Sequence, residues 1–233
     1  MKNILICTDY SIEAENATHY ALSMAKEKRL NVSIFSLQNI SMHIENARLP
    51  ANYFFEQMEQ KKKQLTEKCN ELSILYKIPI EPILATGDFH HELDTIISNN
   101  KIDLVIVGMP EKNIEQSLLG NTTTKLLHIL KIPVLAIPKF QEYIQFKKIL
   151  FAYDLHEEIN FIIMNQIYDF VKKFESEIEV FNVTEQLDEF NKMISDKNIQ
   201  DLFNVNDIKA QFKAVQNTEI IKSLERGIKL NKC

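Results

Sequence analysis

Glycine is scarce in this sequence, with four glycines among 233 residues. Three of them, Gly87, Gly108 and Gly120, lie where an apolar run gives way to a helical pattern. Because the chain otherwise does almost without glycine, these positions are expected to need a positive φ or a close approach between backbone segments.

Other absences exclude whole classes of protein. The three cysteines are scattered, so they form neither a disulfide framework nor a metal-ligand spacing. A net charge of -5, without a basic stripe interleaved with aromatics, argues against nucleic acid or an anionic membrane as a partner. No apolar stretch approaches the roughly 18 residues of a membrane span, and the chain opens directly into a strand. These features predict a cytoplasmic protein with reduced thiols.

The sequence contains the same unit twice. The segments Lys2 to Ile40 and Lys147 to Glu185 each hold a β-branched run that ends in an aspartate, Asp9 or Asp154, followed by a helical pattern and a second apolar run. A repeat at this long period predicts two tandem domains rather than a solenoid. We expect a complete domain over residues 1–140, a linker over 141–146 and a second domain over 147–233.

Apolar runs alternate with helical patterns through the first domain. Strands are predicted over residues 3–8, 32–37, 80–85, 104–107 and 134–137, and helices over 11–28, 53–76, 89–99 and 122–130. Strands that are apolar throughout must be covered on both faces, and short crossovers require parallel order. The fold class is therefore α/β, with a doubly wound, parallel, five-stranded sheet. Ligands of such sheets bind beyond the carboxyl ends of the strands, where Asp9, Leu37 and Gly108 lie.

The segment from Gly120 to Thr124 opens the last helix of the first domain. A helix N-terminus offers unpaired N–H groups and a favourable dipole, and Asn121, Thr122 and Thr123 add polar side chains that suit an anion. The alternative is a plain glycine turn before a capped helix. The residue types alone leave both interpretations open.

Four motifs together resemble the universal stress protein family: Asn3-Ile-Leu-Ile-Cys-Thr-Asp9-Tyr-Ser, Asp103-Leu-Val-Ile-Val-Gly108, Leu119-Gly120-Asn-Thr-Thr and Ile132-Pro-Val-Leu-Ala-Ile-Pro138. The resemblance covers the first 140 residues well and the rest more weakly, as in two-domain members. It implies an adenine nucleotide alpha hydrolase-like sandwich that commonly dimerises through its last strand. It also implies a division into members that bind ATP and members that do not.

The ATP-binding subgroup carries Gly-x-x-Gly, nine residues, then Gly-Ser or Gly-Thr. Here Gly108 matches the first glycine, but Glu111 stands at the second, the spacing to Gly120 is one residue short, and Asn121 replaces the hydroxyl residue. A carboxylate facing a triphosphate in a partly dry pocket costs on the order of a kcal/mol or more. The loop is thus a remodelled version, in which Thr122 and Thr123 compensate if ATP and its magnesium bind.

The base side of the pocket is better preserved. By resemblance, Asp9 lies on the adenine and ribose side, and the backbone of Leu37 meets the adenine edge. A carboxylate at a strand end can accept from an amine or a ribose hydroxyl, and Leu37 supplies an apolar wall. The equal alternative for Asp9 is that it, or Ser11, caps the helix that begins there.

The second repeat keeps Asp154 but has Val215 where the first has Gly87, and it stops before the counterpart of Asp103. It therefore lacks its last two strands and the phosphate loop, and its first strand needs cover from another chain or from residues beyond a shortened end. We expect no nucleotide in this repeat.

Enzyme motifs are weak. The adjacent histidines of His90-His91-Glu92 point in different directions on a helix, so an exposed first helical turn is favoured over a metal site. There is no nucleophile elbow.

We therefore expect a signalling module without enzymatic activity, whose small-molecule or nucleotide ligand orders the loop Ser41 to Ala51. The alternative is a structural or protein-interaction module. Slow ATP hydrolysis is a third option, for which the sequence offers no identifiable water-activating base. An isologous homodimer through Val134 to Ile137 is also expected.

Overall fold

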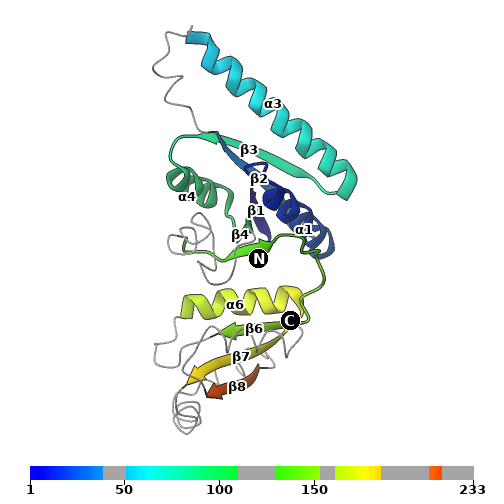
Figure 1. The fold of residues 1–233 in the computed structure, drawn as a ribbon, viewed down its shortest axis with the longest axis vertical. Helices are drawn as coiled ribbons and strands as arrows, with labels where there is room; N and C mark the ends of the chain where they lie inside the picture. The colour runs from blue at the N-terminus through cyan, green and yellow to red at the C-terminus, as the bar shows by residue number, and fades with distance from the viewer. Residues whose placement is uncertain (39–50, 110–129, 153–160, 185–209, 217–233) are drawn as a thin grey trace. The chain divides into compact units, whose positions relative to one another are not determined.

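The computed structural model describes residues 1–38, 51–109, 130–152, 161–184 and 210–216. The chain divides into two compact units, Met1–Ile144 and Gln145–Cys233. Each unit is a separate body with its own parallel sheet (Figure 1).

Unit 1 contains a five-stranded sheet in the order β3-β2-β1-β4-β5, in which every pair is parallel. Its elements are β1 (Asn3–Cys7), α1 (Ile12–Lys28), β2 (Asn31–Gln38), α3 (Ala51–Tyr76), β3 (Ile80–Thr86), α4 (Phe89–Asn100), β4 (Leu104–Met109) and β5 (Val134–Pro138). The predicted α/β fold with a five-stranded parallel sheet is confirmed. The predicted helix over residues 122–130 lies almost entirely outside the described residues.

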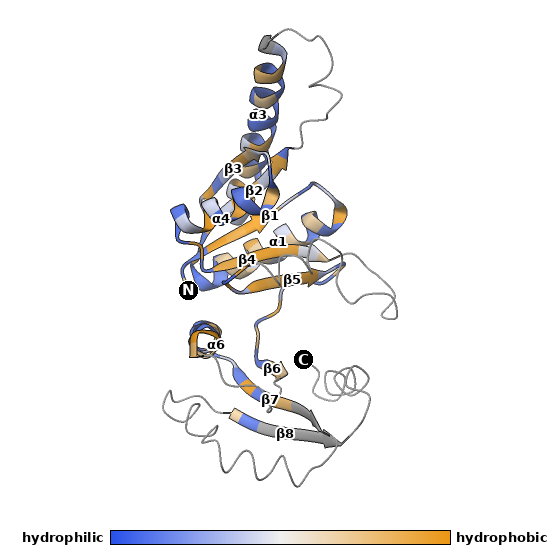
Figure 2. Ribbon diagram, turned by 90° about the vertical axis from the view of Figure 1, so that its left-hand side faces the viewer, coloured by the Kyte–Doolittle hydropathy of each residue, from blue (hydrophilic) through white to orange (hydrophobic). Residues whose placement is uncertain are grey.

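The central strands β1, β2 and β4 are buried because helices cover both faces of the sheet. On one face Leu5, Phe35 and Val105 pack with Leu93 and Ile96 of α4. On the other face α1 buries a stripe of small and apolar residues: Ala14, Ala17, Tyr20, Ala21, Met24 and Ala25. The central strands accordingly form a hydrophobic band through unit 1 (Figure 2). Continuous apolar runs produce this two-sided burial, as expected for parallel strands.

The strand order reverses at β1. This strand pairs with β2 on one side, with Ile4 opposite Val32, and with β4 on the other, with Ile4 opposite Leu104. The chain runs outward from β1 through β2 and β3, and it places β4 and β5 on the opposite side. A ligand of such a sheet binds at this switch point, beyond the carboxyl ends of β1 and β4.

Helix ends in this chain reach the left-handed region without glycine. The C-cap of α1 is Arg29 with φ 52°, and that of α4 is Lys101 with φ 50°. Lys77, which follows α3, has φ 59°. Glycine is the usual residue at such positions because it has no Cβ to clash with the carbonyl. Cationic residues therefore take the place of glycine at these helix ends. Their charge also interacts favourably with the negative end of the helix dipole.

The segment after β5 packs against α1. The side-chain amide of Asn16 donates to the carbonyl oxygens of Pro138 and Gln141, at 3.1 and 3.3 Å. The Tyr143 ring lies edge-on to the Tyr20 ring, with centroids 5.3 Å apart. Unit 1 accordingly extends to Ile144, into the segment predicted as a linker over residues 141–146.

Unit 2 contains β6 (Lys148–Ala152), α6 (Phe161–Phe174), β7 (Glu177–Thr184) and β8 (Ala210–Gln216). Its strands are parallel in the order β6-β7-β8. The succession β6-α6-β7 reproduces the succession β1-α1-β2 of unit 1. Asp154, at the predicted equivalent of Asp9, lies outside the described residues.

A charged pair stabilises the β6–β7 contact. Glu179 points inward from β7 and is 3% exposed, and its Oε2 atom lies 2.7 Å from the Nζ atom of Lys148 in β6. A carboxylate so deeply buried requires a cation and hydrogen-bond donors.

Among the residues that the structure describes, no helix has both the length and the apolar character needed to cross a membrane.

Candidate functional site

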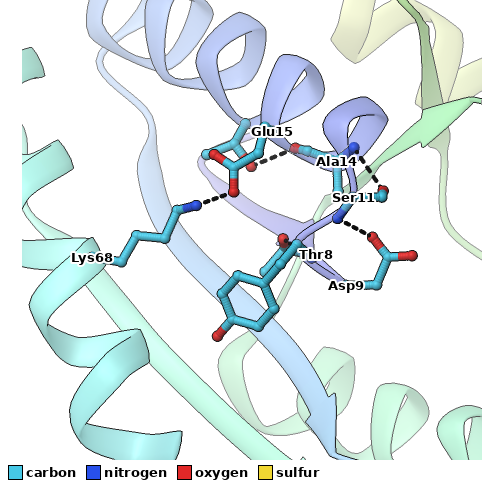
Figure 3. Close-up of polar contacts among 8 residues, drawn as sticks. Thr8, Asp9, Ser11, Ala14, Glu15 and Lys68 are labelled. Carbon is cyan, nitrogen blue, oxygen red and sulfur yellow. Dashed lines mark hydrogen bonds and ion pairs between the residues drawn. The ribbon is translucent and has the colours of Figure 1, made fainter.

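The turn between β1 and α1 carries Asp9 at the carboxyl edge of the sheet. The Oδ1 atom of Asp9 accepts a hydrogen bond from the backbone N–H of Ser11 at 3.0 Å. Ser11 is the N-cap of α1, and its hydroxyl accepts from the N–H of Ala14 at 3.2 Å (Figure 3). Of the two candidate caps, Ser11 performs this role. Asp9 therefore shapes the turn and is left exposed at its tip.

A second set of hydrogen bonds fixes the backbone on either side of Asp9. The Thr8 N–H donates to the carbonyl oxygen of Phe35 at 2.8 Å, and the Thr8 hydroxyl accepts from the N–H of Tyr10 at 3.1 Å. Tyr10 adopts φ 63°, a left-handed conformation that is rare for an aromatic residue. Strained backbone of this kind is concentrated at functional sites.

Leu37 lies near the carboxyl end of β2, where it pairs with Ala85 of β3. Its half-buried side chain packs against the same cluster as Cys7, on the face covered by α4. Burial raises the pKa of the Cys7 thiol to about 12, so this cysteine behaves as a small apolar side chain rather than as a nucleophile. Leu37 is thus a partly buried apolar residue beside the core, and its role as a ligand wall stays a prediction.

Gly108 is the last but one residue of β4 and lies opposite Ile137 of β5, so the strand runs one residue beyond the predicted end. A Cβ atom at this position would lie 2.5 Å from the carbonyl carbon and oxygen of Glu13 and 2.7 Å from the nitrogen of Ala14. The expected close backbone approach is confirmed, and the segment that approaches is the first turn of α1. Gly87 shows the other expected feature, with φ 113°.

The predicted phosphate side of the site lies outside the described residues. This applies to Gly120, Asn121, Thr122, Thr123 and Glu111, and to the loop 41–50. Of the predicted site residues, the structure describes Asp9, Leu37 and Gly108. Leu37 lies in β2, Asp9 lies two residues after β1, and Gly108 lies in β4, and these strands are neighbours in the order β2-β1-β4.

Three residues that the sequence analysis did not single out border the turn. Lys68 of α3 forms an ion pair with Glu15 of α1, and its Nζ atom lies 5.5 Å from the centre of the Tyr10 ring (Figure 3). The only signal in the sequence was the position of Tyr10 directly after Asp9. Lys68 and Glu15 are distant in sequence and resemble ordinary surface charges.

A separate hollow of 330 Å³ lies between α3 and β3. It is lined by Met58, Glu59, Lys62, Leu65, Thr66 and residues 82–84. None of the predicted site residues lines it. The strand-end site is identified instead from sheet topology and residue chemistry.

The pair of adjacent histidines follows the N-cap of α4. Asp88 accepts from the N–H groups of His91 and His90 at 2.9 and 3.1 Å, and these bonds, that of His91 first, hold its pKa below the ordinary value. His91 is exposed as predicted, but His90 is half-buried, with its Nδ1 atom shielded from solvent. Within the described part of the chain, no three His, Cys, Asp or Glu side chains are grouped to hold a metal.

Comparison with known proteins identifies the family. Residues 1–138 match the universal stress protein family, and no curated protein matches the chain. A universal stress protein from Archaeoglobus fulgidus has a similar fold, with a TM-score of 0.75 and 18% identity over 98% of this chain and 84% of its own. A functionally unknown protein from Pseudomonas aeruginosa gives 0.53 and 13% over 99% and 78%. Since the family match covers more than half of the sequence, the chain belongs to the universal stress protein family.

Proposed function

We propose that this protein is a ligand-binding signalling module whose site lies at the carboxyl ends of β1, β2 and β4, and that its ligand is a nucleotide such as ATP or a related small molecule. The observation that carries the proposal is the convergence of Asp9, Leu37 and Gly108 on these neighbouring strands at the switch point of the sheet. This is where open α/β sheets bind their ligands.

The chemistry of the described residues suits the base and sugar of a nucleotide. The Oδ1 atom of Asp9 is used by Ser11, while Oδ2 makes no hydrogen bond to a residue that the structure describes. This oxygen can accept from a ribose hydroxyl or an exocyclic amine, groups that a bound nucleotide supplies. Leu37 adds an apolar contact for the base. Magnesium would accompany the phosphates, on the side predicted from Gly120 to Thr123.

The role of Asp9 is tested by Asp9→Asn, which retains an oxygen for the Ser11 N–H but removes the charge. We expect ATP affinity to fall roughly 10- to 100-fold, because a hydrogen bond to a charged group contributes about 1.5–3 kcal/mol. Calorimetric titration with ATP and magnesium measures the loss.

The matched control is Asp94→Asn, which removes a carboxylate from an exposed position on α4. This variant is expected to bind ATP like the wild type. Equal affinity in Asp9→Asn and the wild type would remove Asp9 from the site.

A second function is favoured by one observation. The close approach of Glu13 and Ala14 explains Gly108 without any ligand, so the remnant of the glycine motif fits a purely structural role. On this alternative the protein is an interaction module of the stress response with a vestigial pocket. ATP binding by the wild type separates the two functions.

The proposal includes three further properties. Ligand is bound without turnover, which an assay for released phosphate tests. The protein forms a homodimer through β5, an edge strand of unit 1, and its solution mass is then twice that of the chain. It resides in the cytoplasm, as its acidic balance and scattered cysteines suggest.

A further inference from the structure

Tyr10 belongs both to the proposed site and to the surroundings of α3. Its backbone follows Asp9 directly and is held in a left-handed conformation, with its N–H bonded to Thr8. A change in the backbone conformation of Tyr10 therefore moves the peptide group that it shares with Asp9. Such a strained aromatic persists only where surrounding contacts hold it.

The phenol group of Tyr10 lies near the end of β2. It is close enough to Ser36, a residue that is 1% exposed, for that side chain to influence the Tyr10 pKa, which burial raises overall. The Ser36 hydroxyl also accepts from the side-chain amide of Gln38 at 3.3 Å. These two polar residues flank Leu37, so the Tyr10 side chain lies between the β1 side and the β2 side of the site.

The ring of Tyr10 is tied to α3. The Nζ atom of Lys68 lies over the ring at 5.5 Å, within the range of a cation–π contact, and the same ammonium pairs with Glu15 of α1. Side chains of Lys68 and Glu15 are 25% and 32% exposed, so the cluster is partly shielded from water and salt. Figure 3 shows the pair beside the turn that carries Asp9.

We propose that Tyr10 is a positioning residue that couples the Asp9 turn to helix α3, so that binding of a ligand to Asp9 reduces local opening of α3. A ligand on Asp9 fixes the turn, the fixed turn holds Tyr10 against Lys68, and the held ring restrains the middle of α3. The ligand half of this coupling, in which a ligand on Asp9 affects α3, rests on the proposed function. The contact half, in which Tyr10 restrains α3, does not, because it concerns the ligand-free protein.

Hydrogen exchange of the full chain without ligand tests the contact half. We expect Tyr10→Ala to speed exchange in the α3 segment 62–72 by about threefold or more, while α4 is unchanged. Tyr10→Phe, which keeps the ring over Lys68, is expected to restore most of the protection. The matched control is Tyr76→Phe, which removes another hydroxyl between α3 and α1, the 2.8 Å bond to Nδ1 of His19.

Two results in this experiment would overturn the coupling. One is unchanged exchange of segment 62–72 in Tyr10→Ala. The other is an equal increase in α3 and α4, because a general loss of stability is not a local link.

Exchange with ATP and magnesium tests the ligand half. In the wild type, saturating ATP is expected to slow exchange in segment 62–72, and in Tyr10→Ala this slowing is lost even at ATP concentrations that saturate the variant. Equal slowing in the variant would contradict the coupling. If the wild type binds no ATP, the proposed function fails, and the ligand-free comparison still decides whether Tyr10 restrains α3.

Discussion

Replacement of Gly108 by alanine is expected to lower the free energy of unfolding by about 3 kcal/mol or more. The new Cβ atom would lie 2.5 Å from the carbonyl atoms of Glu13 and 2.7 Å from the nitrogen of Ala14. These are backbone atoms of the first turn of α1, so no side-chain rotation relieves the overlap. Either α1 or β4 must shift, and both carry buried residues. Chemical denaturation of the wild type and the variant measures the difference.

Gly87→Ala is the control for this prediction. Gly87 has φ 113°, but a Cβ atom there would lie 3.9 Å from its nearest neighbour, the Oε1 atom of Glu92, which is ordinary contact. The substitution therefore adds only backbone strain, about 1 to 2 kcal/mol. If Gly108→Ala proved no more costly than Gly87→Ala, the close approach of α1 would not be what requires glycine in β4.

Lys148→Met is expected to destabilise unit 2 by about 3–5 kcal/mol. The substitution removes the ammonium that lies 2.7 Å from the carboxylate of Glu179, a residue that is only 3% exposed. Removing one member of a buried ion pair costs more than the intact pair contributes, because the remaining charge stays out of water. Denaturant unfolding, with hydrogen exchange of the β7 amides to identify the transition of unit 2, measures the loss.

Two controls separate the effect of burial on stability from the effect of charge. Lys63→Met removes an exposed partner of Glu67, at 77% and 59% side-chain exposure, and is expected to change stability by about 0.5 kcal/mol or less. Lys148→Met combined with Glu179→Leu removes both charges and is expected to recover most of the stability. A cost for Lys148→Met as small as that for Lys63→Met would show that Glu179 does not depend on its partner.

Much of unit 1 could be predicted because its signals are local. Continuous apolar runs mark the five strands, and parallel order then brings Asp9 and Leu37 to one edge of the sheet. The N-cap of α1 could not be assigned, since Asp9 and Ser11 are both good caps and only the geometry of the turn chooses between them. The left-handed caps Arg29 and Lys101 were equally hidden, because their residue types normally indicate helix interior.

Some features of the site depend on tertiary contacts, which the spacing of residues in the sequence does not indicate. Gly108 is required by Glu13 and Ala14, residues almost one hundred positions earlier in the chain, so its cause is a tertiary contact rather than a turn. The same holds for Lys68, which meets Tyr10 only because α3 packs beside the β1–α1 turn. Contacts between distant elements decide such roles, and a single sequence carries no pattern for them.

Calorimetric titration of the wild-type chain with ATP and magnesium tests the central claim most directly. Saturable heat with one site per chain is expected, because the proposed site is formed at the switch point of the unit 1 sheet. The absence of heat at several temperatures would contradict nucleotide binding and would leave the interaction module as the function of this chain.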